Sequence, residues 1–301
     1  MEKFDDILNN TPEQKQNSNP DFNVEEWAAA KKAERDGLYA LADSTATDVV
    51  NDGIKFRQYM DVQSRFDRTS AVNSLLIMAQ KPEATRIMEF DDWKSKGGYI
   101  KPDEKHISIL ERYEYTKKDD GSKGYDFNVK KVFDISQINP RRMKPEPAPP
   151  TLTDRQKVQA LVLNAPVKIT GVDALPDDVV AQTNPETGEI QIRKNVGFSA
   201  TFGSLAKELA SAEIYDNTAT LVDKDFSAYC VSYMLCKKYG ADTEQFSFDD
   251  VDKVFEGLEA KEVKGEIQLI RDTFTEINIR MSKQLEAQQQ QSKAAKNNEA
   301  R

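Results

Sequence analysis

Apolar residues recur at helical spacing through the first third of the chain. Between residues 22 and 41 the apolar positions fall about three or four residues apart, at Trp27, Ala30, Leu38 and Leu41. Such spacing places them on one face of a helix. The pattern therefore predicts a helix with one face turned to a core.

Two more helices are expected before residue 81. Asp, Ser and Thr at 43–45 are residues that favour helix N-caps, so we expect a second helix to begin there. The apolar positions from Val49 to Met60 carry it forward. Apolar spacing predicts a third helix over residues 69–80. It should stop before Pro82, because the residue ahead of a proline disfavours helical geometry.

The pattern then changes to strand-like alternation. Residues 99–100 and 107–113 alternate apolar and polar positions, and 127–135 reads as a returning strand after the turn at 117–124. A brief helix with an acidic start is expected over 91–95. The first half is thus predicted to be helices followed by a small antiparallel sheet.

A proline-rich stretch, KPEPAPP, follows at residues 144–150 and reads as a semi-extended linker. It is the best candidate for a domain boundary. We expect a flexible N-terminal segment at residues 1–21 and a disordered tail at 285–301. Between them we expect two domains, at 22–143 and 152–284, joined by a linker at 144–151.

The second half is predicted to combine helices with a small sheet. Helices are expected at 153–164, 199–214, 226–239, 248–258 and 263–284, and strands at 167–169, 179–182 and 189–193. An apolar stripe from Ile267 to Met281 has helical spacing and indicates core or a partner seam. The fold class is therefore α+β, in two domains.

Composition narrows the possible chemistry. Hydrophobic residues make up 38% of the 301 positions, and 14 Phe, 10 Tyr and 2 Trp are too many for a wholly disordered chain. The single histidine, His106, excludes any two-histidine metal site; we expect it in solvent at a strand edge. Cys230 and Cys236 cannot form a disulfide framework and are expected to be buried and reduced.

No apolar run approaches the roughly 18 residues that would span a bilayer. Residues 1–10, MEKFDDILNN, are acidic and have no apolar core, unlike a secretory signal. The expectation is a cytoplasmic protein without a membrane partner.

Charge is unevenly distributed. The chain carries 42 basic and 51 acidic residues, a net charge of −9. Residues 55–144 hold 19 basic and 14 acidic residues, or +5, which leaves 23 basic and 37 acidic residues, or −14, elsewhere. Nucleic-acid binding needs local rather than global positive potential, so the middle of the chain is a candidate, although a +5 block also occurs in proteins that bind no anion.

Five consecutive residues stand where a metallopeptidase would carry its zinc-binding motif. After the strand at 189–193, the next helix carries Lys207-Glu208-Leu209-Ala210-Ser211, where H-E-x-x-H would place two zinc ligands one turn apart. Lysine is a cation and serine is a poor zinc ligand. These residues predict no zinc site, no cofactor and no catalytic residue.

The first half resembles the ArdC family of antirestriction proteins, which occur on conjugative plasmids and integrative elements. The residues that carry the resemblance are Ser64-Arg65-Phe66, Ser70, Asn73-Ser74-Leu75-Leu76-Ile77, Gln80-Lys81-Pro82-Glu83-Ala84-Thr85, Phe90, Trp93, the run 98–105, the run 107–110 and Val132-Phe133-Asp134-Ile135-Ser136-Gln137.

In the second half, a weaker resemblance runs from about residue 177 to 255. The family's second domain is zincin-like with H-E-x-x-H, and this chain departs from it at Lys207 and Ser211. Ser227, or Asp225 in a shifted register, stands where a third, acidic ligand is expected. The resemblance implies a retained peptidase-like fold and a lost activity, so the chain is not expected to be an enzyme.

The resemblance also implies a single-stranded DNA-binding first domain. Such binding needs cations for phosphates and flat side chains for bases. The candidates are Arg65, Arg68, Tyr59, Lys94, Lys96, Tyr99, Lys101 and Lys105. Trp93 is expected in the core, and Asp103 places a negative charge in the turn that bears Lys101 and Lys105.

Three functions are therefore considered, of which one, a peptidase that survives with unusual metal ligands, is opposed by Lys207 and Ser211 and is settled by metal analysis. The first is a non-enzymatic protein of a mobile element that binds single-stranded DNA and protects incoming DNA from restriction during conjugation, with the second domain as scaffold or as the dock for a host restriction or conjugation protein. The alternative is a protein-interaction module that inhibits a host restriction enzyme through its acidic surface, for which the −14 outside residues 55–144 is the reason.

Overall fold

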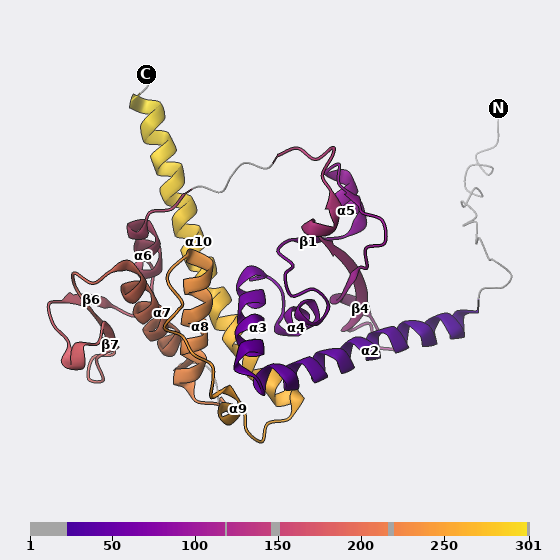
Figure 1. The fold of residues 1–301 in the computed structure, drawn as a ribbon, viewed down its shortest axis with the longest axis horizontal. Helices are drawn as coiled ribbons and strands as arrows, with labels where there is room; N and C mark the ends of the chain where they lie inside the picture. The colour runs from indigo at the N-terminus through magenta and orange to yellow at the C-terminus, as the bar shows by residue number, and fades with distance from the viewer. Residues whose placement is uncertain (1–22, 118, 146–150, 216–219, 300–301) are drawn as a thin grey trace.

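The computed structural model describes residues 23–117, 119–145, 151–215 and 220–299 (Figure 1). The expected flexible segment, 1–21, and residues 146–150 of the expected linker lie outside the described residues. The fold class is α+β, as the sequence predicts: helices dominate, and three small sheets accompany them.

The first helix is longer than expected. α2 runs from Val24 to Val50 without a break, with Asn23 as its N-cap. The expected cap at 43–45 is wrong, because the hydroxyl of Thr45 donates to the Leu41 carbonyl inside the helix (2.7 Å) rather than capping a new one. α3 (Gly53–Arg65) is instead capped by Asp52, whose carboxylate accepts from the Ile54 N–H (2.8 Å).

Helix α4 (Ala71–Gln80) seals one edge of the main sheet. The side-chain amide of Asn73 both donates to the Leu110 carbonyl and accepts from the Leu110 N–H, each at 2.8 Å. Gln80 makes the same pair of bonds with Ser108, at 2.9 Å each. Two side chains seven residues apart thus replace a neighbouring strand along β3 (Ile107–Thr116).

The opposite edge of this sheet is largely open. The strand order is β1–β4–β3, with β4 (Lys123–Asp134) in the middle and antiparallel to both neighbours. β1 (Ile87–Met88) pairs only with Phe133 and Asp134, because the chain turns into α5 (Phe90–Ser95) directly afterwards. Among the described residues, no strand therefore lies beside most of the outer edge of β4.

A second, two-stranded sheet closes this half. β2 (Tyr99–Ile100) pairs antiparallel with β5 (Ile138–Asn139), which follows the 3-10 turn η1 (Ile135–Gln137). Trp93 on α5 is fully buried, as expected.

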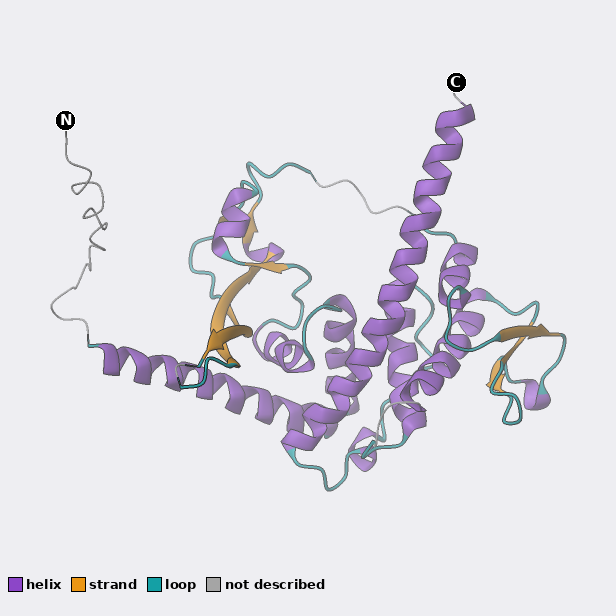
Figure 2. Ribbon diagram, turned by 180° about the vertical axis from the view of Figure 1, so that it is seen from behind, coloured by secondary structure: helices purple, strands orange, loops and turns teal. Residues whose placement is uncertain are grey.

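The second half begins with α6 (Asp154–Val162), capped by Thr153. A three-stranded sheet follows in the order β6–β8–β7, with the turn η2 (Pro176–Asp178) before β7. Figure 2 shows it on the far side of the molecule from β4. The strands are β6 (Ile169–Val172), β7 (Ala181–Thr183) and β8 (Ile190–Arg193).

The remaining helices are α7 (Phe198–Tyr215), α8 (Lys224–Tyr239), α9 (Val251–Val254) and α10 (Ala260–Glu299). The helix expected over 248–258 is limited to α9, because the rings of Phe248 and Phe255 on either side of it pack against Phe56 in an aromatic cluster. The expectation of a disordered tail from 285 is wrong as far as Glu299, because α10 continues to that residue. Residues 285–299 are rich in Ala, Gln, Lys and Glu, which favour helix, and contain no proline or glycine.

One hydrophobic core joins the two halves of the chain. Phe56, Tyr59 and Leu75 from α3 and α4 share it with α7, α8 and α10. The apolar stripe of α10 from Ile267 to Met281 is buried there, so it is core. The expected domains, 22–143 and 152–284, therefore pack as parts of one body.

Polar bonds reinforce this contact at the α3–α4 loop. The Asp67 carboxylate accepts from the Asn278 amide (2.7 Å) and pairs with Lys238 (3.2 Å). Arg271 donates through Nε to the Thr69 carbonyl (3.0 Å). The loop that carries Arg68 is thus held by α8 and α10.

We expect Asn73→Ala to lower the free energy of unfolding by about 1–3 kcal/mol, because it leaves the Leu110 N–H and carbonyl without their partner. Urea denaturation followed by circular dichroism measures it. The matched control is Gln159→Ala, which removes an exposed helical amide and should change stability by less than about 0.5 kcal/mol. Equal effects from both variants would contradict the sealing role of Asn73.

Candidate nucleic-acid interface

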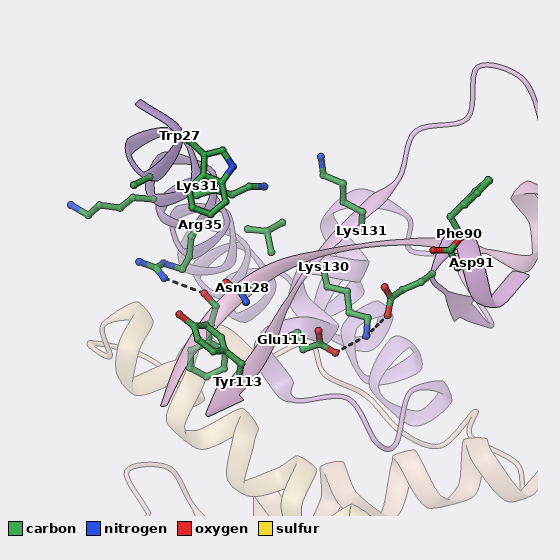
Figure 3. Close-up of a pocket in the computed structure, with 15 residues that line it drawn as sticks. Trp27, Lys31, Arg35, Phe90, Asp91, Glu111, Tyr113, Asn128, Lys130 and Lys131 are labelled. Atoms are coloured by element: carbon green, nitrogen blue, oxygen red, sulfur yellow. Dashed lines mark hydrogen bonds and ion pairs between the residues drawn. The ribbon is translucent and has the colours of Figure 1, made fainter. Parts of the chain in front are cut away.

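A groove of about 820 Å³ lies along the open edge of β4. Figure 3 shows its three walls: α2 on one side, β4 across the middle, and the start of α5 on the other. Cations and rings line it together with three acidic residues; the main side chains are Trp27, Lys31, Lys32, Arg35, Glu89, Phe90, Asp91, Glu111, Tyr113, Phe127, Lys130 and Lys131.

The α2 wall arises from a simple repeat. Trp27, Lys31 and Arg35 are four residues apart, which places them on one face of the helix. The Arg35 guanidinium pairs with Asp126 (2.9 Å) and donates to the Phe127 carbonyl (3.1 Å), and so ties α2 to β4. These bonds hold the ring of Trp27 beside the strand edge.

A bridged lysine occupies the middle of the groove. Lys130 contacts Glu111 and Glu89, each at 2.5 Å. The hydrogen bonds that Lys130 donates to Glu111, and then to Glu89, raise the pKa of its ammonium group above its ordinary value. The two carboxylates also offset its charge toward an anion. The other cations beside the groove have acidic partners too: Lys31 and Lys131 contact Glu34, at 3.0 and 3.6 Å, and Arg35 pairs with Asp126.

The rings of the groove are accessible. Trp27 is 53% exposed, Phe90 47%, and Tyr113 and Phe127 37% each. Exposed rings beside cations offer both contacts that unpaired nucleotides use: a flat face for a base and a positive charge for a phosphate.

A second hollow of about 620 Å³ adjoins the groove and shares Glu89, Glu111, Phe127 and Lys130 with it. Arg68 lines this second hollow. The two hollows thus form one cationic and aromatic track over β4, from α2 at one end to the α3–α4 loop at the other.

The structure contradicts Tyr59 as a base-stacking residue. Its side chain is fully buried, and its hydroxyl contacts Gln63 at 3.3 Å. Burial raises the pKa of the Tyr59 hydroxyl far above its ordinary value. Its helical spacing belonged to the core face of α3, which sequence spacing alone does not distinguish from a ligand face.

The other predicted DNA contacts are exposed, but only Arg68 lines the two hollows. Arg65 donates to the Pro82 carbonyl. Tyr99 is 44% exposed, and Lys101 donates to the Ser136 carbonyl (2.6 Å). Lys94, Lys96 and Lys105 are exposed on α5 and the loop before β3, where His106 is exposed as expected. They remain predicted contacts, and none of them lines either hollow.

Sequence reasoning missed the α2 wall and the lysine pair of β4. A Trp-to-Lys-to-Arg repeat at intervals of four, through Trp27, Lys31 and Arg35, was a usable signal. The adjacent Lys130 and Lys131 gave no such signal in the sequence. Both line one groove only because the edge of β4 beside them is open.

The peptidase-like position on α7 holds no metal-binding set. Glu208 accepts a hydrogen bond from the Thr183 hydroxyl (2.7 Å), and Lys207 lies 3.9 Å from Asp225. Within the described residues, no group of three or more His, Cys, Asp or Glu side chains could hold a metal ion. Cys230 and Cys236 are buried on α8, as expected.

A buried carboxylate fixes the strand end beside the groove. Asp134 accepts hydrogen bonds from the N–H groups of Thr85 (2.7 Å), Arg86 (2.9 Å) and Ser136 (2.8 Å). Burial raises its pKa, but the hydrogen bonds from Ser136, Arg86 and Thr85 outweigh burial and leave the pKa below its ordinary value. The ionised Asp134 therefore sets where β1 meets β4.

The fold and the groove define an α+β protein with a cationic, ring-lined surface suited to a polyanion. Residues 50–139 match the family model described as the N-terminal domain of anti-restriction factor ArdC. Over these residues the chain carries an ArdC-like N-terminal domain. The match begins where α2 ends, so the α2 wall of the groove lies outside it.

Two solved structures are similar to the chain at low identity. The metal-free crystal structure of the antirestriction ArdC protein from plasmid R388 shares 16% identity, with a TM-score of 0.42, over 71% of this chain and 83% of that one. Its Mn(II)-bound structure shares 15%, with a TM-score of 0.47, over 71% and 84%. Likenesses this distant transfer no site or function. No curated protein matches the sequence significantly.

No helix within the described part of the chain is long and apolar enough to cross a membrane.

Asp134→Asn should cost about 1–3 kcal/mol of stability at pH 7, since an amide cannot replace a carboxylate that accepts three N–H bonds. A carboxylate with a lowered pKa stabilises the fold above its unfolded pKa, and this contribution is lost as the pH falls through the folded value. The cost should therefore shrink from pH 7 toward about pH 3.

Urea unfolding at the two pH values measures this cost. Asp173→Asn, at a carboxylate whose side chain is 92% exposed, is the control and should show little change at either pH. A cost for Asp134→Asn that is equal at both values would contradict the assigned role.

Proposed function

We propose that the groove along β4 binds single-stranded DNA, and that the chain is a non-enzymatic antirestriction protein of a mobile element. The observation that carries the proposal is the combination of exposed Trp27, Phe90 and Tyr113 with the cations of α2 and β4 along one track. The match of residues 50–139 to an anti-restriction factor domain supports it.

The arrangement favours unpaired over paired strands. Stacking on a side-chain ring needs a base whose face is free, and duplex bases are already stacked. Phosphates in either case would meet Lys31, Lys32 and Lys131, which attract the backbone whatever its sequence. The expected binding is therefore weakly sequence-dependent and strongly salt-dependent.

Protection would follow from occlusion. A strand held in the track has its backbone against the protein, where a nuclease or a restriction enzyme cannot approach it. The second half of the chain then serves as scaffold: α8 and α10 hold the α3–α4 loop, and with it Arg68, at the end of the track. A host restriction or conjugation protein is the partner class for its remaining surface.

Replacing Trp27 tests the groove directly. Trp27→Ala should weaken binding to a labelled oligothymidylate of about 20 nucleotides by about tenfold, because base–aromatic stacking contributes about 1–3 kcal/mol per base. Trp27→Phe keeps a ring and should lose much less. Fluorescence anisotropy at two salt concentrations measures both.

Intrinsic fluorescence gives a second readout for the same complex. Trp93 is fully buried and Trp27 is exposed, so quenching on DNA addition should come from Trp27 and vanish in Trp27→Phe. As charge variants, Lys32→Ala with Lys131→Ala should flatten the salt dependence, whereas Lys261→Ala with Lys253→Ala should not. Absence of binding at low salt would reject the proposal.

The second half should hold no zinc. Purified full-length chain is expected to contain far less than one zinc per molecule, because Lys207 places an ammonium where a ligand is needed. Chelation with EDTA should leave DNA affinity and stability unchanged. A stoichiometric zinc content, measured by plasma mass spectrometry, would contradict the non-enzymatic assignment.

A further inference from the structure

The hairpin of β3 and β4 carries a ring just outside the groove. Side chains alternate between the two faces of a strand, so Tyr113 and Tyr115 share one face of β3. Their partners in β4 are Asp126 and Gly124. Tyr113 lines the groove (Figure 3), whereas Tyr115 lies two residues closer to the hairpin turn and lines neither hollow. The face that presents Tyr113 to the groove therefore presents Tyr115 directly beyond it.

A glycine fixes the position of the Tyr115 ring. The ring folds across the hairpin onto Gly124, where a Cβ atom would lie 2.6 Å from its Cζ and 2.9 Å from its hydroxyl oxygen. Glycine inside a strand weakens it and often marks the close approach of another group. Here that group is the ring of Tyr115, which remains 43% exposed. Packing on the Gly124 backbone therefore orients the ring before any ligand arrives.

The two tyrosine rings stand at a separation that suits neighbouring nucleotides. Their centroids are 6.2 Å apart and their planes are inclined by 44°. Stacked nucleotides rise about 3.4 Å each along one strand, so 6.2 Å is shorter than two such steps. At this tilt neither ring lies flat on the other. Both therefore keep a surface on which a base can stack.

The charges around this pair are already matched. The carboxylate of Asp126 pairs with Arg35 (2.9 Å) and contacts the Tyr113 hydroxyl (3.5 Å). At the hairpin end Glu114 pairs with Lys123 (2.6 Å). Residues 114–124 contain three acidic and three basic side chains. The contribution of Tyr115 to binding is therefore stacking rather than attraction for phosphate.

A third tyrosine of the hairpin points the other way. Tyr125 pairs with Glu114, so its side chain lies on the opposite face from Tyr113 and Tyr115. The guanidinium of Arg112 lies 3.7 Å from the centre of its ring. Arg112 lines the second hollow, but Tyr125 lines neither hollow. Tyr125 is thus a residue of the same type, 53% exposed, against which Tyr115 can be compared.

We propose that Tyr113 and Tyr115 form a two-ring platform on which bases of the single strand stack where it leaves the groove at the hairpin end. The inference rests on the proposed function, since the strand that the platform receives is the one held in the groove. Tyr113 belongs to both surfaces and joins them. Tyr115 adds a base contact that needs an unpaired base and does not depend on salt.

The test uses the full-length chain and the labelled oligothymidylate. Tyr115→Ala should weaken binding about tenfold, because a stacked base loses its ring. The factor should be the same at both salt concentrations, because no phosphate contact is removed. Tyr115→Phe, which keeps the ring, and Tyr125→Ala, the matched control, should each stay within about twofold of the unaltered chain. Fluorescence anisotropy measures all four.

Gly124→Ala tests the platform with every tyrosine in place. The added methyl group must displace the Tyr115 ring, so affinity should fall nearly as far as in Tyr115→Ala. Because both changes act on one ring, the double variant should bind no more weakly than Tyr115→Ala alone. Losses that multiply in the double variant would contradict the platform. Circular dichroism of each variant checks that the fold is retained.

Photo-cross-linking tests the unaltered chain and needs no variant to fold. Oligothymidylate that carries iodouracil at successive positions should cross-link to Tyr115 and not to Tyr125, as mapped by mass spectrometry. Cross-links that avoid Tyr115, or unchanged affinity in Tyr115→Ala, overturn the inference; the proposed function still stands if Trp27→Ala weakens binding. If the unaltered chain binds no DNA at low salt, the proposed function fails and the platform with it.

Discussion

The burial of α3 and α4 against α8 and α10 is the constraint on which the rest of the structure depends. Phe56 and Tyr59 enter the common core, and Asp67 and Arg271 tie the loop between α3 and α4 to the long helices. With α4 fixed, Asn73 and Gln80 close one edge of β3. The opposite edge of the sheet, along β4, is then the one left for a ligand.

The groove follows from the way the chain leaves β1. An open strand edge invites association, and proteins usually cover it or place charge along it. Here α2 stands beside the edge without pairing, and Lys130 and Lys131 provide the charge. The same charge that discourages strand addition also suits this surface to a polyanion.

The second half of the chain supports the first through the shared core. Lys207 and Asp225 approach each other where a metal ligand set would be needed, and Glu208 accepts a hydrogen bond from Thr183. α8 is buried by its neighbours through residues such as Tyr233 and Met234.

The sequence by itself determined the α+β class, most helices and strands, the buried Trp93 and the absence of a histidine pair, because periodicity and residue chemistry are local properties. It misplaced the start of α3, since Ser44 and Thr45 satisfy caps and helix interiors alike. It also assigned Tyr59 to a ligand face. Only the tertiary structure decided which face of each helix is buried, that Trp27 and Lys131 share one groove, and that β4 keeps an open edge, because each depends on contacts between residues far apart in the chain.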